Sequence, residues 1–140
     1  MYRRRWCGLH EGKEGIRDMK RRTLSERKID APVISLDIED EVHALKTEPE
    51  WIAGEQNGIT LAKYPHMRVV LVALRRGTSL REHKVEGPMA LCLLSGKVSV
   101  TVRKTRYQVQ EGGLFTLRKT VPHDVEALED SAFLLTIMHM

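Results

Sequence analysis

The stretch Lys97-Val-Ser-Val-Thr-Val-Arg103 alternates apolar and polar side chains without a break. Successive side chains of a β-strand point to opposite faces, so the three valines share one face while the Ser and Thr share the other. The stretch therefore predicts a strand that packs one face against a core and exposes the other to solvent. Similar alternation resumes in residues 105–110, directly after Arg103-Lys104, which predicts a tight hairpin.

Short runs rich in Val, Leu, Ile and Thr extend on both sides of this hairpin, from residue 59 to residue 138. Gly, Pro and charged pairs separate the runs at intervals of about eight to twelve residues, a spacing typical of β-sandwiches and β-barrels. We therefore expect an all-β domain. The predicted strands are 59–63, 67–75, 79–86, 89–95, 97–103, 105–110, 113–117, 121–127 and 132–138.

Two of these runs, Val69 to Leu74 and Met89 to Leu94, are apolar on both faces. Such a strand needs cover on both sides, so one face must meet the core and the other must meet the N-terminal segment or a second subunit. We expect a homodimer on this ground. Trp51 and Ile52 are expected to hold the N-terminal segment against the main body.

One short helix is predicted before the strands. The apolar residues from Ile38 to Leu45 follow the spacing of one helix face, and Asp37 is a candidate N-cap ahead of an acidic first turn. Proline disfavours helical backbone in the residue before it, so Pro49 is expected to end the helix near Thr47.

The chain of 140 residues and 16.0 kDa fits a single domain. Its net charge of +4 is concentrated at the N-terminus, because residues 1–30 hold ten Lys or Arg against five Asp or Glu, and the remainder holds thirteen against fourteen. We therefore predict a flexible basic extension over residues 1–30 and one domain over residues 31–140, with its barrel at 59–138. A basic arm can bind phosphate backbones, but no nucleic-acid-binding motif accompanies this one, so a nucleic acid partner is not expected.

Membrane-spanning and disulfide-rich classes do not fit the sequence. The longest apolar runs have six residues, far fewer than the ~20 that a membrane-spanning helix needs. Cys7 and Cys92 are the only cysteines, too few for a disulfide framework or a Cys-rich zinc site. We therefore expect a reducing, cytoplasmic location and no membrane partner.

Five spaced residues resemble a known family. Gly77, His83 and Gly96, followed by Gly112 and His123, match by their spacing the two signature motifs of the cupin superfamily. The resemblance covers the whole predicted β region. It implies a cupin-type double-stranded β-helix, that is, a jelly-roll barrel, with a short helix before it.

Two of the four metal ligands in the family's motifs are replaced in this chain. The resemblance aligns Val85 with the family's second histidine and Met89 with its glutamate, which leaves His83 and His123. The second motif also departs from the family pattern, with Arg118, Thr120 and Ala127 at its proline, glycine and asparagine positions.

The expected ligand-binding residues are Arg81, His83, Met89 and His123. Period-2 alternation puts Arg81 and His83 on one face of their predicted strand. An arginine on the interior face of a narrow barrel would be costly without an anionic partner, so Arg81 is expected to bind an anionic group there.

His83 and His123 are also the candidate ligands for one divalent transition metal ion. A catalytic zinc uses three protein ligands and a water, and a non-haem iron uses two histidines and a carboxylate, so two imidazoles do not complete either set. Two imidazoles with the Met89 thioether would instead suit copper(I). A core role for Met89 is the simpler interpretation, since methionine often fills gaps in cores.

We predict that the chain binds a small polar or anionic ligand in the barrel mouth. The resemblance implies an alternative function, a metal-dependent enzyme of the dioxygenase or isomerase type that uses His83 and His123. A third hypothesis is a regulatory or nucleic-acid-associated role of residues 1–30. The sequence contains no Gly-x-Ser-x-Gly elbow, P-loop or dinucleotide-binding fingerprint.

Overall fold

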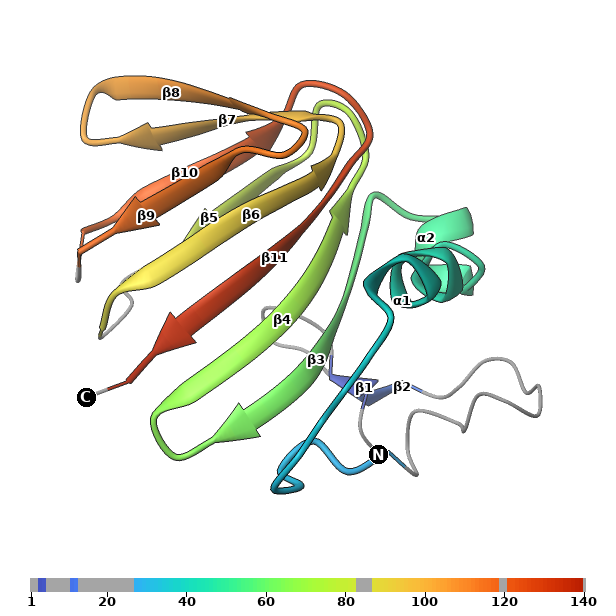
Figure 1. The fold of residues 1–140 in the computed structure, drawn as a ribbon. Coiled ribbons are helices and arrows are strands. Elements are labelled where there is room, and N and C mark those ends of the chain that lie inside the picture. The colour runs from blue at the N-terminus through green and yellow to red at the C-terminus, as the bar shows by residue number, and fades with distance from the viewer. Residues whose placement is uncertain (1–2, 5–10, 13–26, 83–86, 119–120, 140) are drawn as a thin grey trace.

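The computed structural model describes residues 3–4, 11–12, 27–82, 87–118 and 121–139. A four-stranded sheet of order β5-β10-β7-β8 packs face to face on a five-stranded sheet of order β3-β4-β11-β6-β9 (Figure 1). Both sheets are antiparallel throughout. The strands are β3 (Gln56–Tyr64), β4 (Met67–Leu74), β5 (Ser79–Glu82), β6 (Met89–Ser95), β7 (Lys97–Val102), β8 (Thr105–Gln110), β9 (Leu114–Leu117), β10 (His123–Ala127) and β11 (Ser131–Met138).

The all-β class and the short helix before the sheets are confirmed. The predicted apolar face of β7 is confirmed, since Val98 and Val100 are fully buried and the register places Val100 between Val125 of β10 and Tyr107 of β8. The prediction that the other face is open to solvent is wrong at Ser99, which is 4% exposed and accepts a hydrogen bond from Arg106 Nε at 3.1 Å. Every predicted strand is present. Residues 83–86 of the predicted strand 79–86 lie outside the described residues.

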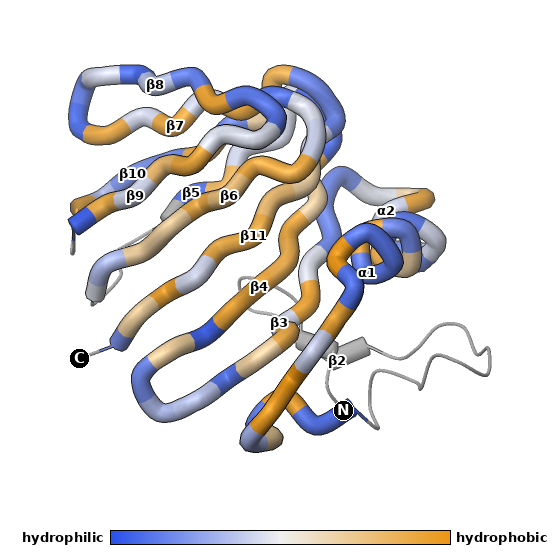
Figure 2. The backbone as a smooth tube through the Cα atoms, in the orientation of Figure 1, coloured by the Kyte–Doolittle hydropathy of each residue, from blue (hydrophilic) through white to orange (hydrophobic). Residues whose placement is uncertain are grey.

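The core lies between the two sheets, where the buried side chains of alternate positions meet. Phe133 of β11 is the largest fully buried side chain in it. Apolar segments run along β4, β11 and β6 in Figure 2, as expected for strands that are covered on both faces. The buried members are Val70, Val72, Leu74, Leu80, Met89, Leu91, Leu93, Val98, Val100, Val109, Val125, Ala127, Phe133, Leu135 and Ile137.

Two helices, α1 (Ile38–Leu45) and α2 (Pro49–Ile52), cover the outer face of β3 and β4 (Figure 1). The predicted cap is present, because Asp37 Oδ1 accepts a hydrogen bond from the backbone N–H of Asp40 at 3.1 Å. Trp51 is buried in this second apolar cluster, as predicted. Ile52 is 66% exposed, so the prediction that it also anchors the segment is wrong. No helix in the described residues is long and apolar enough to cross a membrane.

Residues 27–30 belong to the packed domain rather than to the basic extension in which the charge pattern placed them. Ile29 is buried, and its carbonyl accepts a hydrogen bond from the N–H of Lys63 at 2.7 Å. Arg27 forms a two-bond ion pair with Glu41 of α1, at 2.9 and 3.2 Å. Before residue 27, the structure describes only β1 (Arg3–Arg4) and β2 (Glu11–Gly12), which pair with each other.

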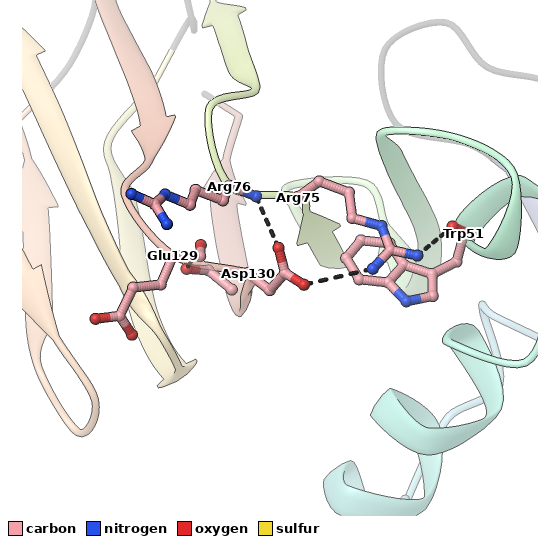
Figure 3. Close-up of polar contacts among 6 residues, drawn as sticks. Trp51, Arg75, Arg76, Glu129 and Asp130 are labelled. Carbon is pink, nitrogen blue, oxygen red and sulfur yellow. Dashed lines mark hydrogen bonds and ion pairs between the residues drawn. The ribbon is translucent and has the colours of Figure 1, made fainter.

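One end of the sandwich, which we call the clamp end, is held by a stacked arginine (Figure 3). The Arg75 guanidinium lies 3.9 Å from the centre of the Trp51 ring and donates a hydrogen bond to the Trp51 carbonyl at 2.9 Å. Its other nitrogen pairs with Asp130 Oδ2 at 3.4 Å, while Asp130 Oδ1 accepts from the N–H of Arg76 at 2.8 Å. The clamp thus ties α2 to the β4–β5 and β10–β11 turns.

Gly96 and Ser131 meet beside this clamp. Gly96 has φ +88°, and a Cβ built on it would lie 2.3 Å from the hydroxyl of Ser131, so only glycine fits here. The fully buried Ser131 hydroxyl accepts from the Lys97 N–H at 3.0 Å and lies within hydrogen-bonding distance of the Lys97 and Glu129 carbonyls. This contact joins the β6–β7 and β10–β11 turns.

Candidate functional site

The opposite end of the sandwich, which we call the His123 end, is where β10 begins. In the register of the four-stranded sheet, His123 pairs with Glu82 of β5 and with Val102 of β7. Residues 83–88 lead from Glu82 to Met89 of the other sheet. The start of β10, the end of β5 and the start of β6 therefore lie at the same end of the fold (Figure 1).

His123 is the inward-facing polar residue that opens β10. It is only 4% exposed and shares its face with Val125 and Ala127, both of which belong to the core. Its Nδ1 lies 3.0 Å from the Val121 carbonyl. A carbonyl can only accept, so Nδ1 carries the proton, and in the neutral imidazole Nε2 presents its lone pair. No hydrogen bond of Nε2 is present among the described residues.

Met89 lies in a row of paired residues that crosses the five-stranded sheet at this end. The register runs from Arg68 of β4 through Ile137 of β11 and Met89 to Leu117 of β9. Met89 is 4% exposed and packs in the core between Ile137 and Leu117. It therefore forms part of an apolar wall, with Leu117 and Phe115 packed against the same cluster.

Arg68 is a polar residue of this end that the sequence analysis missed. Val70 and Val72 of β4 face the core, and period-2 alternation places Arg68 on the same face. Its side chain is half-buried, its Nε is buried, and it pairs in register with the core residue Ile137. The sequence does hold one indication of this orientation. Arg68 alternates with Val70 and Val72 along the strand, so all three side chains are expected on the same face.

The prediction that Arg81 faces the interior is wrong. In β5 the buried residue is Leu80, which pairs with the core residue Val125, whereas Arg81 is exposed and pairs with the exposed Asp124. Leu80 is the apolar residue of this short strand, and its side chain packs in the core. Successive side chains point to opposite faces, so Arg81 lies on the outer face. The arginine on the inner face is Arg68.

The candidate metal site is incomplete in the described residues. His83 lies outside them, and no group of three His, Cys, Asp or Glu within the described part of the chain could hold a metal ion. His123 alone fits such a role, because metal-binding histidines usually donate their second ring N–H to a carbonyl or carboxylate. The described side chains therefore do not form a metal centre, and Met89 packs as a core residue.

The C-terminal segment ends at the same place. The N–H of Met138 donates to the Pro88 carbonyl and the N–H of His139 donates to the His66 carbonyl, both at 2.9 Å. These bonds fix the last described residues beside the β3–β4 turn and the start of β6.

Two antiparallel sheets packed face to face place the chain in the class of β-sandwiches to which the jelly-roll folds belong. No family model and no curated protein matches the sequence. Among solved structures, it is similar to a conserved protein of unknown function from Streptococcus pyogenes, with TM-score 0.62 and 20% identity over 81% of this chain and 93% of that one.

Two further structures give the same answer. A cupin superfamily protein from Desulfitobacterium hafniense has TM-score 0.59 and 14% identity, over 61% of this chain and 79% of that one. A cupin-2 domain containing protein from Shewanella frigidimarina has TM-score 0.59 and 13% identity, over 74% and 94%. At these identities the likeness is one of fold, and the chain has the cupin fold predicted from its motif spacing.

Proposed function

We propose that this chain binds a small polar or anionic molecule at the His123 end. One observation carries the proposal: the inward, buried imidazole of His123, whose Nδ1 is bonded to a carbonyl and whose Nε2 has no hydrogen bond to the part of the chain that the structure describes. Burying a polar ring among apolar side chains costs free energy unless its polar atoms are satisfied. A ligand that donates a hydrogen bond to Nε2 would satisfy the second nitrogen.

The surroundings support a small molecule rather than a macromolecule. His123 lies inside the sandwich next to core residues of both sheets, where side chains such as Val102 and Leu117 are only partly buried. Binding sites of small molecules are mainly apolar, with a few polar groups that orient the ligand. The His123 end matches that composition.

The test is a screen of hydroxylated and carboxylated fragments by ligand-observed NMR against the full chain. Hits are expected to lose binding in His123→Ala and to keep it in His43→Ala, because His43 lies exposed on α1. Hits that bind both variants equally well, or a screen without hits, would contradict the proposal.

The competing proposal is a metal-dependent enzyme of the dioxygenase or isomerase type that uses His83 and His123. The hydrogen bond from Nδ1 of His123 to the Val121 carbonyl is the observation in its favour. Elemental analysis of tag-free protein decides between the two. Stoichiometric metal that resists chelators would favour the enzyme, and the double variant Val85→His, Met89→Glu should gain a divalent ion if the motif alignment is correct.

Self-association stays a proposal, and the structure narrows where to test it. The N-terminal helices cover β3 and β4. On the same outer face, the cross-strand row of Leu134, Cys92 and Leu114 ends at β9, where Leu114 is 67% exposed. Strand β9 also ends the sheet order, and unpaired edges favour pairing with another chain.

Light scattering tests this homodimer. Leu114→Asp should weaken it, and Ile52→Asp, at an equally exposed residue of α2, should not. A monodisperse monomer at about tens of micromolar, where a micromolar interface would be populated, would contradict the proposal. The cytoplasmic location remains a prediction that fractionation can test.

A further inference from the structure

We infer that the ligand of the His123 end is a small hydroxy acid, whose carboxylate binds Arg68 and whose hydroxyl donates to His123. This inference rests on the proposed function and narrows it to one chemical class. The juxtaposition behind it is an arginine and a histidine that face the interior from opposite sheets at one end of the fold.

Arg68 supplies the charge. Its position in the row with Ile137 and Met89 places its side chain on the core side of β4, and its Nε is buried. A guanidinium has five N–H donors in a planar fork, which matches the two oxygens of a carboxylate. Arg68 also interacts with another group of the chain, and the number of its donors allows a carboxylate in addition.

His123 requires a ligand that donates a hydrogen bond. With the proton on Nδ1, the neutral ring offers an acceptor at Nε2. A carboxylate has no proton to donate at neutral pH, so the same ligand must carry a hydroxyl or N–H group to satisfy His123. An acid with a hydroxyl meets both residues at once.

The apolar wall makes the charged contact selective. Ile137 lies next to Arg68 in the row, and Met89 and Leu117 follow on the side of Ile137 away from Arg68. Charge-assisted hydrogen bonds strengthen when apolar side chains exclude water around them. A neutral analogue of equal shape would lose the charge-assisted contact with the guanidinium, so discrimination by charge is expected to be large.

The experiment measures binding of matched acids and amides to the full chain by calorimetry. The probes are lactate and lactamide, mandelate and mandelamide, and 4-hydroxybenzoate and 4-hydroxybenzamide, with benzoate as the acid without a hydroxyl and inorganic phosphate as a second anion. At least one acid should bind about ten-fold or more tightly than its amide, a ratio typical of one charge-assisted contact.

Variants assign the contacts. Arg68→Gln should lower affinity for the acid about ten-fold or more and remove its preference over the amide. Arg81→Gln is the matched control, because Arg81 lies at the same end of the fold but is exposed on the outer face of the other sheet, and it should change affinity by less than about three-fold. His123→Ala should reduce 4-hydroxybenzoate to the affinity of benzoate.

A folding defect in Arg68→Gln would be visible in its melting curve. Arg68→Lys then carries the test, because it keeps the charge and loses the fork, and it should bind the acid several-fold more weakly than the wild type.

The outcomes separate this inference from the proposed function. Equal binding of acids and amides, or tighter binding of phosphate than of every acid, would overturn the hydroxy-acid class while leaving a ligand site in place. Failure of all probes, together with fragment hits that still depend on His123, would do the same. Failure of all probes without any such hits would overturn both.

Discussion

The two ends of the sandwich solve the same problem, a polar group inside an apolar fold, in opposite ways. At the clamp end, the buried hydroxyl of Ser131 has several backbone partners, and the buried amide of Asn57 donates to the Leu45 carbonyl and to Glu48. At the other end, His123 has one hydrogen bond within the described ranges, to a carbonyl two residues away.

The two ends are expected to differ in what they contribute, the clamp end mainly to stability and the His123 end mainly to binding. A buried polar network with every group satisfied makes a structure rigid and specific. A buried ring with one nitrogen that no described residue bonds is a feature expected at functional sites, where local rules of structure are broken. We therefore expect substitutions at the clamp end to cost stability and substitutions at His123 to cost mainly binding.

The largest effect is expected for Trp51→Ala. The ring is 5% exposed, packs in the cluster of α1, β3 and β4, and carries the Arg75 guanidinium. Its loss should lower the free energy of unfolding by about 3–5 kcal/mol, measured by urea denaturation. Ile52→Ala, next to it but exposed, should cost under about 0.5 kcal/mol. Similar costs for both variants would show that the clamp does not hold the N-terminal layer.

Ser131→Ala should cost about 1–3 kcal/mol, because it removes the fully buried hydroxyl that accepts from the partly buried N–H of Lys97. The same denaturation measurement applies, and Ser79→Ala on the exposed face of β5 is the control. A neutral result at Ser131 would mean that water replaces the hydroxyl, and that this end is less tightly built than its hydrogen bonds indicate.

His123→Ala should cost about 1 kcal/mol or less in unfolding free energy, since only one hydrogen bond is lost. The fragment binding described above should nevertheless disappear. A stability loss as large as that of Trp51→Ala would place His123 in the structural framework and remove the contrast between the ends.

The smallest effect concerns Asp130 and pH. The backbone N–H of Arg76, assisted by the Arg75 guanidinium, lowers the pKa of Asp130 from its ordinary value of 3.8. A carboxylate whose pKa is lower in the folded state stabilises that state above its unfolded pKa, and this contribution is lost as the pH falls through the folded value.

Asp130→Asn should therefore be less stable than wild type at pH 7, by under about 1 kcal/mol because the side chain is 52% exposed. The gap should close below pH 3.8. Denaturation of both proteins from pH 7 down to the acid limit measures it, and a gap independent of pH would contradict the role of the carboxylate charge.

The strands were predictable because their period is short and their breaks are marked by turn residues. The six residues of β7 alternate apolar and polar side chains, and the repetition of such short segments along the chain predicts the all-β class. The cap at Asp37 was equally local, since it spans one helical turn.

The site was less predictable because it depends on parity and on pairing between distant segments. Strand β5 contains one buried apolar residue, Leu80, and so carries too little alternation to tell which face Arg81 takes. Arg68 stands just before an apolar run, and only its pairing with Ile137 shows that it faces inward. The contact of Arg75 with Trp51 likewise joins residues 24 positions apart.

The position of the last strand has a practical consequence for anyone who labels this protein. His139 is bonded to the β3–β4 turn at the end where Arg68 and His123 face inward. A fluorophore attached there would offer a further test of the proposed site, because a ligand that enters beside it is expected to change its emission. A polyhistidine tag at the same place would bring foreign imidazoles beside His123 and confuse any metal analysis, so purification handles belong elsewhere on the chain.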